Sequence, residues 1–394
     1  MRTDKAYHFL FFGLTSFRSL PQREQALALE CARLGHEVDF IEIAPSVAGR
    51  LHALSNRLFS PLSRDEGFTY TAQYPTLRIH TPPTLPTGFR NSLTPAIDRA
   101  LFRRWFNATF RERDLSDSIV MVMMPLWWGN FIDRDFLRPA LLVYDICDSL
   151  EVQARSAETL SRLRTCERAL ASEADLITYS AREMEADIRR AYPQSQAYFI
   201  PNAVSREFIA HVDGEPLSSR NGQPPTIGYI GSTSGKWFDA ELVLAVARAL
   251  PECTVSIVGP VDRRFTEHCR SLSNIELHGY VPHAALAAQL RRFDVAIIPF
   301  LDNEITRIVN PLKLYEYSVA GLPIVARRTE ELAHYAGLLY LADTQERFIS
   351  EIRRALEEND PALARDRRLF AERNTWEGRV RDFLQRIQQP VLAA

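Results

Sequence analysis

Apolar runs alternate with segments of helical period along the whole chain. The runs are rich in Val, Ile, Phe and Tyr and occupy 7–14, 36–44, 118–125, 141–147, 175–180, 197–201, 226–231, 253–259, 274–281, 295–300 and 323–327. Continuous apolar character is typical of strands buried on both faces, as in a parallel sheet. Helical periodicity predicts helices over 22–34, 151–171, 236–250, 283–292 and 311–320. This alternation predicts an α/β fold of doubly wound sheets.

A segment rich in turn-forming residues interrupts this pattern. Residues 211–225 contain Gly, Pro, Ser and Asn and almost no large apolar side chain, which is typical of a linker. A second βα series starts directly after it. We therefore expect two Rossmann-like domains, over 1–205 and 206–374, followed by a terminal helix within 375–394. Doubly wound domains bind ligands at the carboxyl ends of their strands, so the function is expected in a cleft there.

Composition excludes several classes of protein. Of 394 residues, 46% are hydrophobic and 24% charged, which excludes a disordered or collagen-like chain. Lys and Arg total 47 against 49 Asp and Glu, so the basic excess of a nucleic-acid binder is missing. The five scattered cysteines form no C-x-x-C pair, which favours a reducing compartment. No run of 18 apolar residues occurs, so a cytoplasmic protein without a membrane-spanning helix is expected.

The most informative segment begins at Asn310. Asn310 can cap a helix, Pro311 fits the first turn of that helix, and Gly321 would end it. The amides and positive dipole end of such a helix suit a diphosphate. Lys313 in the first turn is unfavourable for the dipole unless an anion compensates it. Glu316, on the same face, could accept hydrogen bonds from ribose hydroxyls. A capped helix with a solvated ion pair is the alternative interpretation.

A second candidate phosphate loop follows the strand that starts at Thr226. Gly231 would let the main chain approach a ligand closely, and Lys236 could neutralise a phosphate. The glycine spacing does not match a P-loop, so an ordinary βα turn is an equally good interpretation.

Residues 310–325, Asn-Pro-Leu-Lys-Leu-Tyr-Glu-Tyr-Ser-Val-Ala-Gly-Leu-Pro-Ile-Val, resemble the donor-site helix of GT-B glycosyltransferases of the GT4-like group. Transferases of teichuronic acid and other exopolysaccharides are the nearest subset. The segments 275–282 and 293–300 match the same family in order and spacing. Residues 374–379 resemble its final helix, which crosses back to the N-terminal domain. The resemblance covers 226–388 closely and the first domain more loosely.

The resemblance implies a site for a nucleotide diphosphate sugar, with UDP as the expected nucleotide. Glu316 would bind the donor ribose. The diphosphate would be held by main-chain groups of Gly231, Asn310, Pro311 and Leu312 and by Lys313. The main chain at Tyr280 and Val281 would contact the base. Many members of the group have a second Glu eight residues before the ribose Glu, where this chain has Ile308. Sugar recognition is therefore expected to differ, and a retaining mechanism is not assumed.

The polar loop after the first strand resembles the acceptor loop of such transferases. Arg18, Gln22 and Arg23 would contact the acceptor, and the two arginines could bind a phosphate on it. A solvated loop and an ordinary helix start are the alternative. The loop lacks the catalytic His that some inverting enzymes of this fold place there, so a general base must come from elsewhere.

The strand 141–147 ends in acidic residues, where the chemistry of a doubly wound domain is expected. Asp148 is the first candidate and Asp145 the second for the base that accepts the proton of the acceptor hydroxyl. Capping of the next helix and internal hydrogen bonding are the alternatives. Asp133 and Asp135 form a D-x-D pattern, but no strand leads into it, so no metal site is expected.

Residues 97–113 are predicted to form a helix in which basic residues surround aromatic ones: Arg99, Arg103, Arg104, Arg111 and Arg113 around Trp105, Phe106 and Phe110. Such a helix can lie on anionic lipid. A helix packed in the core with a solvated basic face is the alternative.

Together these features predict a metal-independent, cofactor-free glycosyltransferase. It would transfer a hexosyl or glycuronosyl unit from a nucleotide sugar to a glycan or lipid-linked acceptor in cell-surface polysaccharide biosynthesis. It would act in the cytoplasm, at the inner face of the membrane if 97–113 binds lipid. A non-catalytic nucleotide-sugar-binding protein and a GT-B sugar epimerase are the alternatives, and Ile308 gives the former some support.

Overall fold

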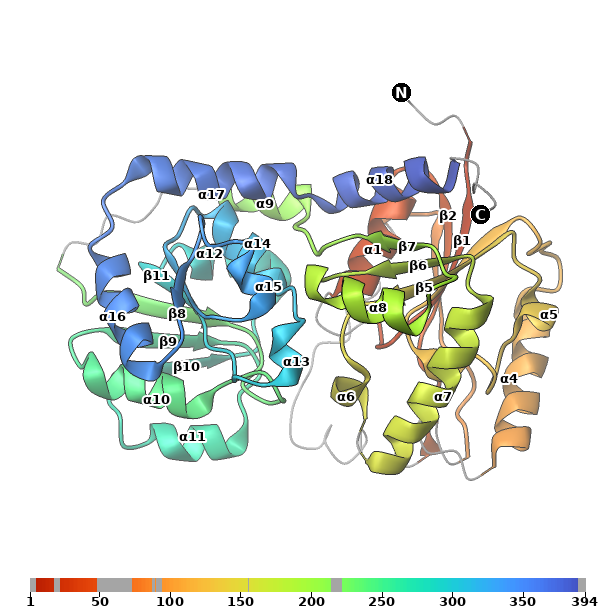
Figure 1. Cartoon of the computed structure of the whole chain (residues 1–394), viewed down its shortest axis with the longest axis horizontal. Helices are drawn as coiled ribbons and strands as arrows, with labels where there is room; N and C mark the ends of the chain where they lie inside the picture. Colours follow the sequence, from red (N-terminus) through yellow and green to blue (C-terminus); the bar gives the residue numbers. More distant parts are fainter. Residues whose placement is uncertain are drawn as a thin grey trace. The chain divides into compact units, whose positions relative to one another are not determined.

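The computed structural model describes residues 5–17, 22–47, 73–86, 89, 94–154, 156–213 and 222–388. Contacts divide the chain into two units (Figure 1). The first comprises residues 1–180 and 184–200, and the second comprises 181–183 and 201–394.

The first unit is built on a seven-stranded parallel sheet of order β3-β2-β1-β4-β5-β6-β7. The strands are β1 (His8–Phe12), β2 (Glu37–Ile41), β3 (Leu77–His80), β4 (Ser118–Val122), β5 (Leu141–Ile146), β6 (Leu176–Tyr179) and β7 (Ala197–Phe199). The central strands β1 and β4 are almost wholly buried. Because all strands run the same way, their carboxyl ends share one edge of the sheet.

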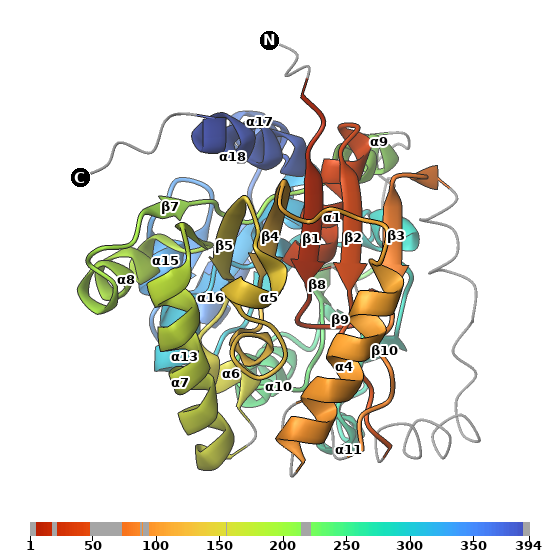
Figure 2. The same ribbon diagram turned by 90° about the vertical axis from the view of Figure 1, so that its right-hand side faces the viewer.

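Helices cover both faces of this sheet, with α1 on one side and α4 on the other (Figures 1 and 2). They are α1 (Arg23–Arg33), α4 (Pro95–Thr109), α5 (Arg134–Leu137), α6 (Leu150–Gln153), α7 (Ala157–Glu173) and α8 (Glu185–Ala191), with short 3-10 turns at Pro125–Trp127 and Arg182–Met184.

The second unit contains a six-stranded parallel sheet of order β10-β9-β8-β11-β12-β13. The strands are β8 (Thr226–Ile230), β9 (Thr254–Val258), β10 (Ile275–Gly279), β11 (Val295–Ile298), β12 (Ile324–Arg327) and β13 (Tyr340–Ala342). Two apolar clusters form its core, one including α14 and the other α10.

The helices of this unit are α9 (Arg206–Asp213), α10 (Ala240–Ala249), α11 (Arg263–Cys269), α12 (Leu286–Leu290), α13 (Glu304–Arg307), α14 (Leu312–Val319), α15 (Glu330–Ala333), α16 (Gln345–Leu356), α17 (Pro361–Arg373) and α18 (Trp376–Gln388), with a 3-10 turn at His283–Ala285. In the described part of the chain, no helix is both long and apolar enough to cross a membrane.

The predicted α/β class is confirmed, and each predicted apolar run contains a strand. Two edge strands, β3 and β13, were not predicted because they are short and only partly buried. The helix expected over 151–171 is wrong as a single element, because the chain turns between α6 and α7. The linker expected over 211–225 begins too early, since α9 continues to Asp213. The packing of α18 on the first domain stays a prediction.

Candidate active site

Three glycine loops meet at the carboxyl edge of the second sheet. Gly231 and Gly259 follow β8 and β9, and Gly279 is the last residue of β10; their φ angles are 148°, 132° and 65°. The amide of Gly259 donates to the Gly279 carbonyl at 2.7 Å. A Cβ on Gly259 would lie only 2.4 Å from the carbonyl oxygen of Gly231. Only glycine permits this close approach of main chains, which leaves main-chain groups at the edge where ligands bind.

The first turn of α14 brings Lys313 to the loop at Gly231. A Cβ on Gly231 would lie 2.6 Å from Cε of Lys313 and 2.8 Å from its Nζ. The ammonium also lies 5.3 Å from the ring centroid of Tyr229. Burial lowers the pKa of Lys313, and the nearby Glu316 carboxylate opposes that shift. A half-buried ammonium beside the amides of a helix start forms a site for an anion.

Tyr317 fixes α14 against β8. Its hydroxyl accepts a hydrogen bond from the amide of Ile230 at 2.9 Å, one residue before Gly231. The side chain is fully buried. Tyr317 was not among the predicted site residues, although it directly follows Glu316 in the sequence. This hydrogen bond fixes the position of the loop at Gly231 relative to α14.

Glu316 has a partner that the sequence analysis missed. Nε2 of His283 lies 3.5 Å from its Oε1, and the Glu316 side chain is 15% exposed. The His283 ring packs on Phe208, with centroids 4.9 Å apart. His283 follows Pro282 directly, at the end of a segment already expected near the donor base. The arrangement presents a fixed carboxylate that can accept hydrogen bonds from sugar hydroxyls.

The remaining predicted donor residues lie on loops. Tyr280 is 41% exposed and Val281 is half-buried, both directly after β10. Lys236 is exposed, and its carbonyl accepts a hydrogen bond from Asn303 at 2.9 Å. The helix expected to start near it begins later, at Ala240, because Asp239 is the residue whose side chain caps α10.

Asn310 does not cap α14, so that expectation is wrong. The N-cap is Pro311, which offers no side-chain hydrogen bond. Asn310 is 2% exposed and its side chain points to other partners in the second unit, Asn202 and Glu331 among them. Tertiary hydrogen bonds have replaced the local cap.

In the first unit, Arg23 and Asp145 form a buried ion pair. Nε and Nη2 of Arg23 donate to the two carboxylate oxygens, each at 2.8 Å, and Nη1 donates to the Ile200 carbonyl at 2.7 Å. Thr178 donates to the same carboxylate at 2.5 Å. Arg23 is 4% and Asp145 1% exposed. These contacts join α1 to β5 and fit a positioning role for both residues.

Asp148 lies two residues beyond β5, at the edge where ligands are expected. Burial raises the pKa of its carboxyl to about 6, and the Arg23 charge opposes the shift. Among the described residues, none forms a hydrogen bond with this carboxylate. Ser149 occupies the N-cap of α6 without a capping hydrogen bond, so neither side chain serves as a cap. A half-buried carboxyl with a pKa near neutrality suits a general base.

Two carboxylates shape the loop after β1. Glu24 accepts hydrogen bonds from the amides of Leu14 at 2.5 Å and Thr15 at 2.8 Å. Glu42 accepts one from the amide of Phe17 at 2.7 Å. Burial raises the pKa of Glu24. Of the predicted acceptor residues, Gln22 is exposed at the N-cap of α1, and Arg18 lies outside the described residues.

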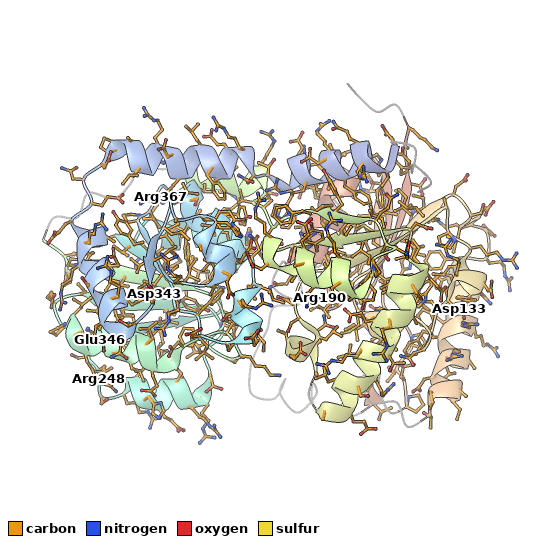
Figure 3. The ribbon with its side chains drawn as sticks, viewed as in Figure 1. Asp133, Arg190, Arg248, Asp343, Glu346 and Arg367 are labelled. Carbon is orange, nitrogen blue, oxygen red and sulfur yellow. The ribbon has the colours of Figure 1, made fainter. Side chains whose placement is uncertain are left out.

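Asp133, labelled in Figure 3, caps α5 by accepting a hydrogen bond from the amide of Phe136 at 2.8 Å. It also pairs with Arg103 at 2.5 Å. Arg99 donates to the carbonyls of Gly129 and Asn130, at 2.6 Å each. Asp133 of the D-x-D pattern and two of the five arginines of the predicted basic face, Arg99 and Arg103, are therefore used to fasten α4 to the neighbouring loop.

A different face of α4 remains exposed. Its apolar members Ile97 and Leu101 are 55% and 40% exposed. Arg104 is exposed on the same helix, three residues after Leu101. The helix expected over 97–113 ends at Thr109, so the exposed Arg111 lies just beyond α4. This is an amphipathic stripe of apolar and basic side chains.

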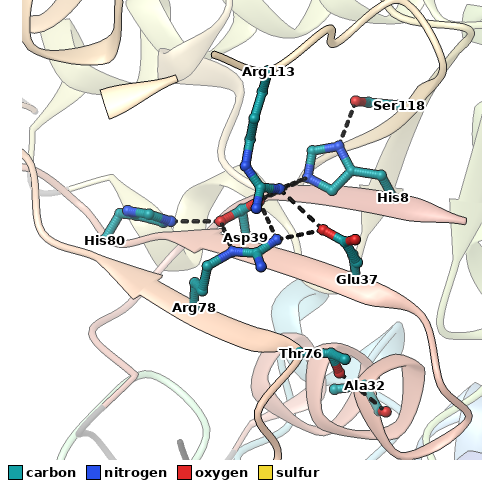
Figure 4. A network of polar contacts seen from close by, with 9 residues as sticks. All are labelled: His8, Ala32, Glu37, Asp39, Thr76, Arg78, His80, Arg113 and Ser118. Carbon is teal, nitrogen blue, oxygen red and sulfur yellow. Dashed lines mark hydrogen bonds and ion pairs between the residues drawn. The ribbon is translucent and has the colours of Figure 1, made fainter. Parts of the chain in front are cut away.

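A separate polar cluster joins β1, β2, β3 and Arg113 in the first unit (Figure 4). The Asp39 carboxylate accepts hydrogen bonds from Arg78 and Arg113 at 2.8 and 2.9 Å, and contacts His8 and His80 at 2.7 and 2.6 Å. Asp39 is fully buried, and its hydrogen-bond donors hold its pKa well below the ordinary range against the effect of burial. Because these contacts tie three neighbouring strands together around one buried charge, this cluster stabilises the fold.

Residues 224–358 match the family model described as Glycosyl transferases group 1. This match lies within the second unit. The chain is also 27% identical over 171 residues to TuaH of Bacillus subtilis, a protein named as a candidate glycosyltransferase of teichuronic acid biosynthesis. This match covers 41% of the chain and 43% of TuaH, less than half of that relative. The resemblance seen in residues 310–325 is thus confirmed.

Solved structures extend the likeness to nearly the whole chain. Sucrose-phosphate synthase of Thermosynechococcus elongatus has a TM-score of 0.70 at 15% identity, over 97% of this chain and 98% of that one. HepE of Anabaena, solved with UDP and glucose, has a TM-score of 0.68 at 13% identity, over 97% and 99%. At such low identity the likeness shows the fold, and the predicted GT-B fold is confirmed.

Proposed function

We propose that the chain is a glycosyltransferase that moves a sugar from a UDP-sugar to a hydroxyl of a glycan or lipid-linked acceptor in the synthesis of a cell-surface polysaccharide. The observation that carries this proposal is the match of residues 224–358 to group 1 glycosyl transferases, with Lys313 packed against Gly231 at the start of α14. Two of the similar proteins support its details: HepE was solved with UDP, and the name of TuaH refers to a cell-wall polymer.

The donor site would stabilise the leaving diphosphate with charges of the chain itself. The Lys313 ammonium and the amides of the first turn of α14 provide positive charge that needs no reorganisation during the reaction. An arriving diphosphate would also offset the cost of burying the Lys313 charge. Glu316 would accept hydrogen bonds from the ribose hydroxyls. This arrangement underlies the proposal that catalysis is independent of metal.

Asp148 would act as the general base. It would take the proton of the acceptor hydroxyl while that oxygen attacks the anomeric carbon, and the bond from this carbon to the diphosphate oxygen would break and release UDP. Direct displacement of this kind inverts the anomeric configuration. Arg23 and Asp145 would set the position and electrostatics of Asp148. Gln22, and Arg18 before it, would contact the acceptor.

A lipid-linked acceptor would place the protein on the inner face of the membrane. The exposed side chains of Ile97, Leu101 and Arg104 on α4, with Arg111 just beyond its end, are the apolar and basic side chains that an interfacial helix needs. The membrane contact would then use α4 from its exposed side, because Arg99 and Arg103 are already bound to the neighbouring loop.

A non-catalytic nucleotide-sugar-binding protein is the second candidate, and Ile308 is the observation that favours it. This half-buried residue ends α13 where many group members have a carboxylate. An apolar side chain cannot accept hydrogen bonds from the donor sugar. Nucleotide binding would then persist without transfer.

The experiment that separates these candidates measures nucleotide release. Thermal shift with UDP, GDP and ADP sugars would first select the donor. UDP release from the selected donor would then be followed with and without a panel of glycan and lipid-linked acceptors. A transferase releases UDP in proportion to acceptor glycosylated. Donor binding without release would favour the binding protein, and conversion of the donor sugar without acceptor would favour an epimerase.

A further inference from the structure

Asn310 is the centre of a buried hydrogen-bond network directly before α14. Its Oδ1 accepts from the amide of Asn202 at 3.1 Å and from the Tyr315 hydroxyl at 3.0 Å. Its Nδ2 donates to Glu331 Oε1 and to the Tyr335 hydroxyl, at 2.9 Å each. Both donors and both acceptor sites of the amide are thus used. A fully satisfied buried network of this kind fixes its members in one arrangement.

Glu331 on α15 joins this network to a second segment. Its carboxylate is fully buried, and its Oε2 accepts from the amides of Arg182 and Glu183 at 2.7 and 3.4 Å. The Glu183 side chain contacts Nε2 of His334 at 2.8 Å, also on α15. Residues 181–183 belong to the second unit, although the chain on both sides of them belongs to the first. α15 therefore holds the short segment by which the chain enters and leaves the second unit.

Asn202 provides the third connection. It follows Pro201, where the chain enters the second unit for the last time. Its Nδ2 donates to the Asn310 carbonyl at 2.6 Å, so two hydrogen bonds join the two residues. The carbonyl of Pro201 accepts from Arg379 at 3.1 Å. The chain crosses between the units at 181–183 and at 201–202. Hydrogen bonds connect both segments to Asn310, the first through Glu331 and the second through Asn202.

We propose that Asn202 and Glu331 are positioning residues for the donor site, acting through Asn310. Pro311 caps α14 without a side-chain hydrogen bond, so the start of the helix depends on the residue before it. Any shift of Asn310 would turn the first amides of α14 and move Lys313 relative to Gly231. Nucleotide affinity therefore depends on the crossing segments 181–183 and 201–202, which offer no group to the ligand. This inference rests on the proposed donor site.

The test measures UDP binding by calorimetry in Asn202→Ala, Glu331→Gln and the double variant. Substitutions along coupled networks change affinity by about 2- to 30-fold, so each single variant should raise the UDP dissociation constant within this range. The double variant should raise it by less than the product of the two, because both act through Asn310. With a UDP-sugar as substrate, the KM for donor should rise more than kcat falls.

Asn274→Ala is the matched control. Nδ2 of Asn274 donates to the carbonyls of Ala247, Leu250 and Cys253 at 2.9, 3.2 and 3.0 Å. It precedes β10 and so lies at the amino edge of the same sheet, opposite the donor site. Its loss should lower the unfolding temperature of the second unit and leave UDP affinity unchanged.

One outcome would overturn the positioning role and leave the proposed function intact. In it, Asn202→Ala and Glu331→Gln lower the stability as the control does, but bind UDP with wild-type affinity. Wild-type protein that binds no UDP would overturn both. Where Glu331→Gln does not fold, Tyr335→Phe removes one hydroxyl from Asn310 and should raise the UDP dissociation constant by a smaller factor. An unchanged value in that variant would equally count against the inference.

Discussion

Replacing Asp148 by Asn tests the proposed base through the pH dependence of turnover. The carboxyl has a pKa of about 6 because it is buried. By the ordinary titration relation, about nine tenths of it is ionised at pH 7 and about one tenth at pH 5. A base is active when deprotonated, so kcat/KM should fall about tenfold per pH unit below pH 6. Asp148→Asn should lower kcat by about 10²- to 10⁴-fold and abolish this acidic limb.

Asp145→Asn is the matched comparison, because the same substitution is made three residues away. The Arg23 charge lowers the pKa of Asp148, and Asp145 now neutralises that arginine. Neutralising Asp145 should leave Arg23 to act more strongly, so the acidic limb should move to lower pH. The assay is UDP release at pH 4.5 to 8, with UDP binding at pH 7 as a control for folding. If the Asp148→Asn variant stays active and its activity still falls at acidic pH, the assignment of Asp148 is refuted. If the Asp145→Asn variant is inactive in the same assay, Asp145 is the base.

Three further changes test other parts of the molecule. Glu316→Gln should weaken UDP binding by about 1.5–3 kcal/mol, the range for hydrogen bonds to a charged group, and unchanged calorimetric affinity would remove Glu316 from the site. Asp39→Asn should lower the free energy of unfolding by about 3 kcal/mol, because it removes one partner of buried ion pairs. The folded pKa of Asp39 is depressed, so its contribution is present above the ordinary value of 3.8 and lost as pH falls below it. Acid unfolding of the variant should therefore depend less on pH, and a parallel pH profile would contradict this. Replacing Arg104 and Arg111 by Gln should weaken binding to anionic vesicles by about 1 kcal/mol per charge, measured by co-sedimentation, and high salt should have the same effect. Wild-type protein that does not sediment with such vesicles at low salt would exclude the membrane contact.

Hydrophobic patterning was sufficient for the main architecture because the central strands are buried on both faces. It failed at β3, where Arg78 and His80 alternate with apolar residues, and at β13, which has three residues. Both are edge strands, and a short, half-polar edge strand lacks the continuous apolar run on which the prediction depended.

Local rules also placed Gly231 and Lys313 in segments that the structure brings into contact, since glycine loops and helix starts are recognisable from neighbouring residues. Asn310 could not be predicted in this way. Its partners Asn202 and Glu331 lie 108 and 21 residues away, and the sequence gives no sign of such pairing. Capping preference is a local tendency, and tertiary hydrogen bonding overrode it.

The balance of charges distinguishes Lys313 and Asp148 from the buried ion pairs of this chain. Asp145 is neutralised by two hydrogen bonds from Arg23. Arg367 is neutralised by Glu358, whose two carboxylate oxygens each accept a hydrogen bond from a guanidinium nitrogen at 2.6 Å. Lys313 and Asp148 differ, because burial shifts both pKa values toward the neutral form and nearby charges offset this only in part. Such a cost persists in a fold when a ligand or a reaction step later compensates it. For Lys313 the compensating group would be an incoming diphosphate, and for Asp148 it would be the proton of the acceptor hydroxyl.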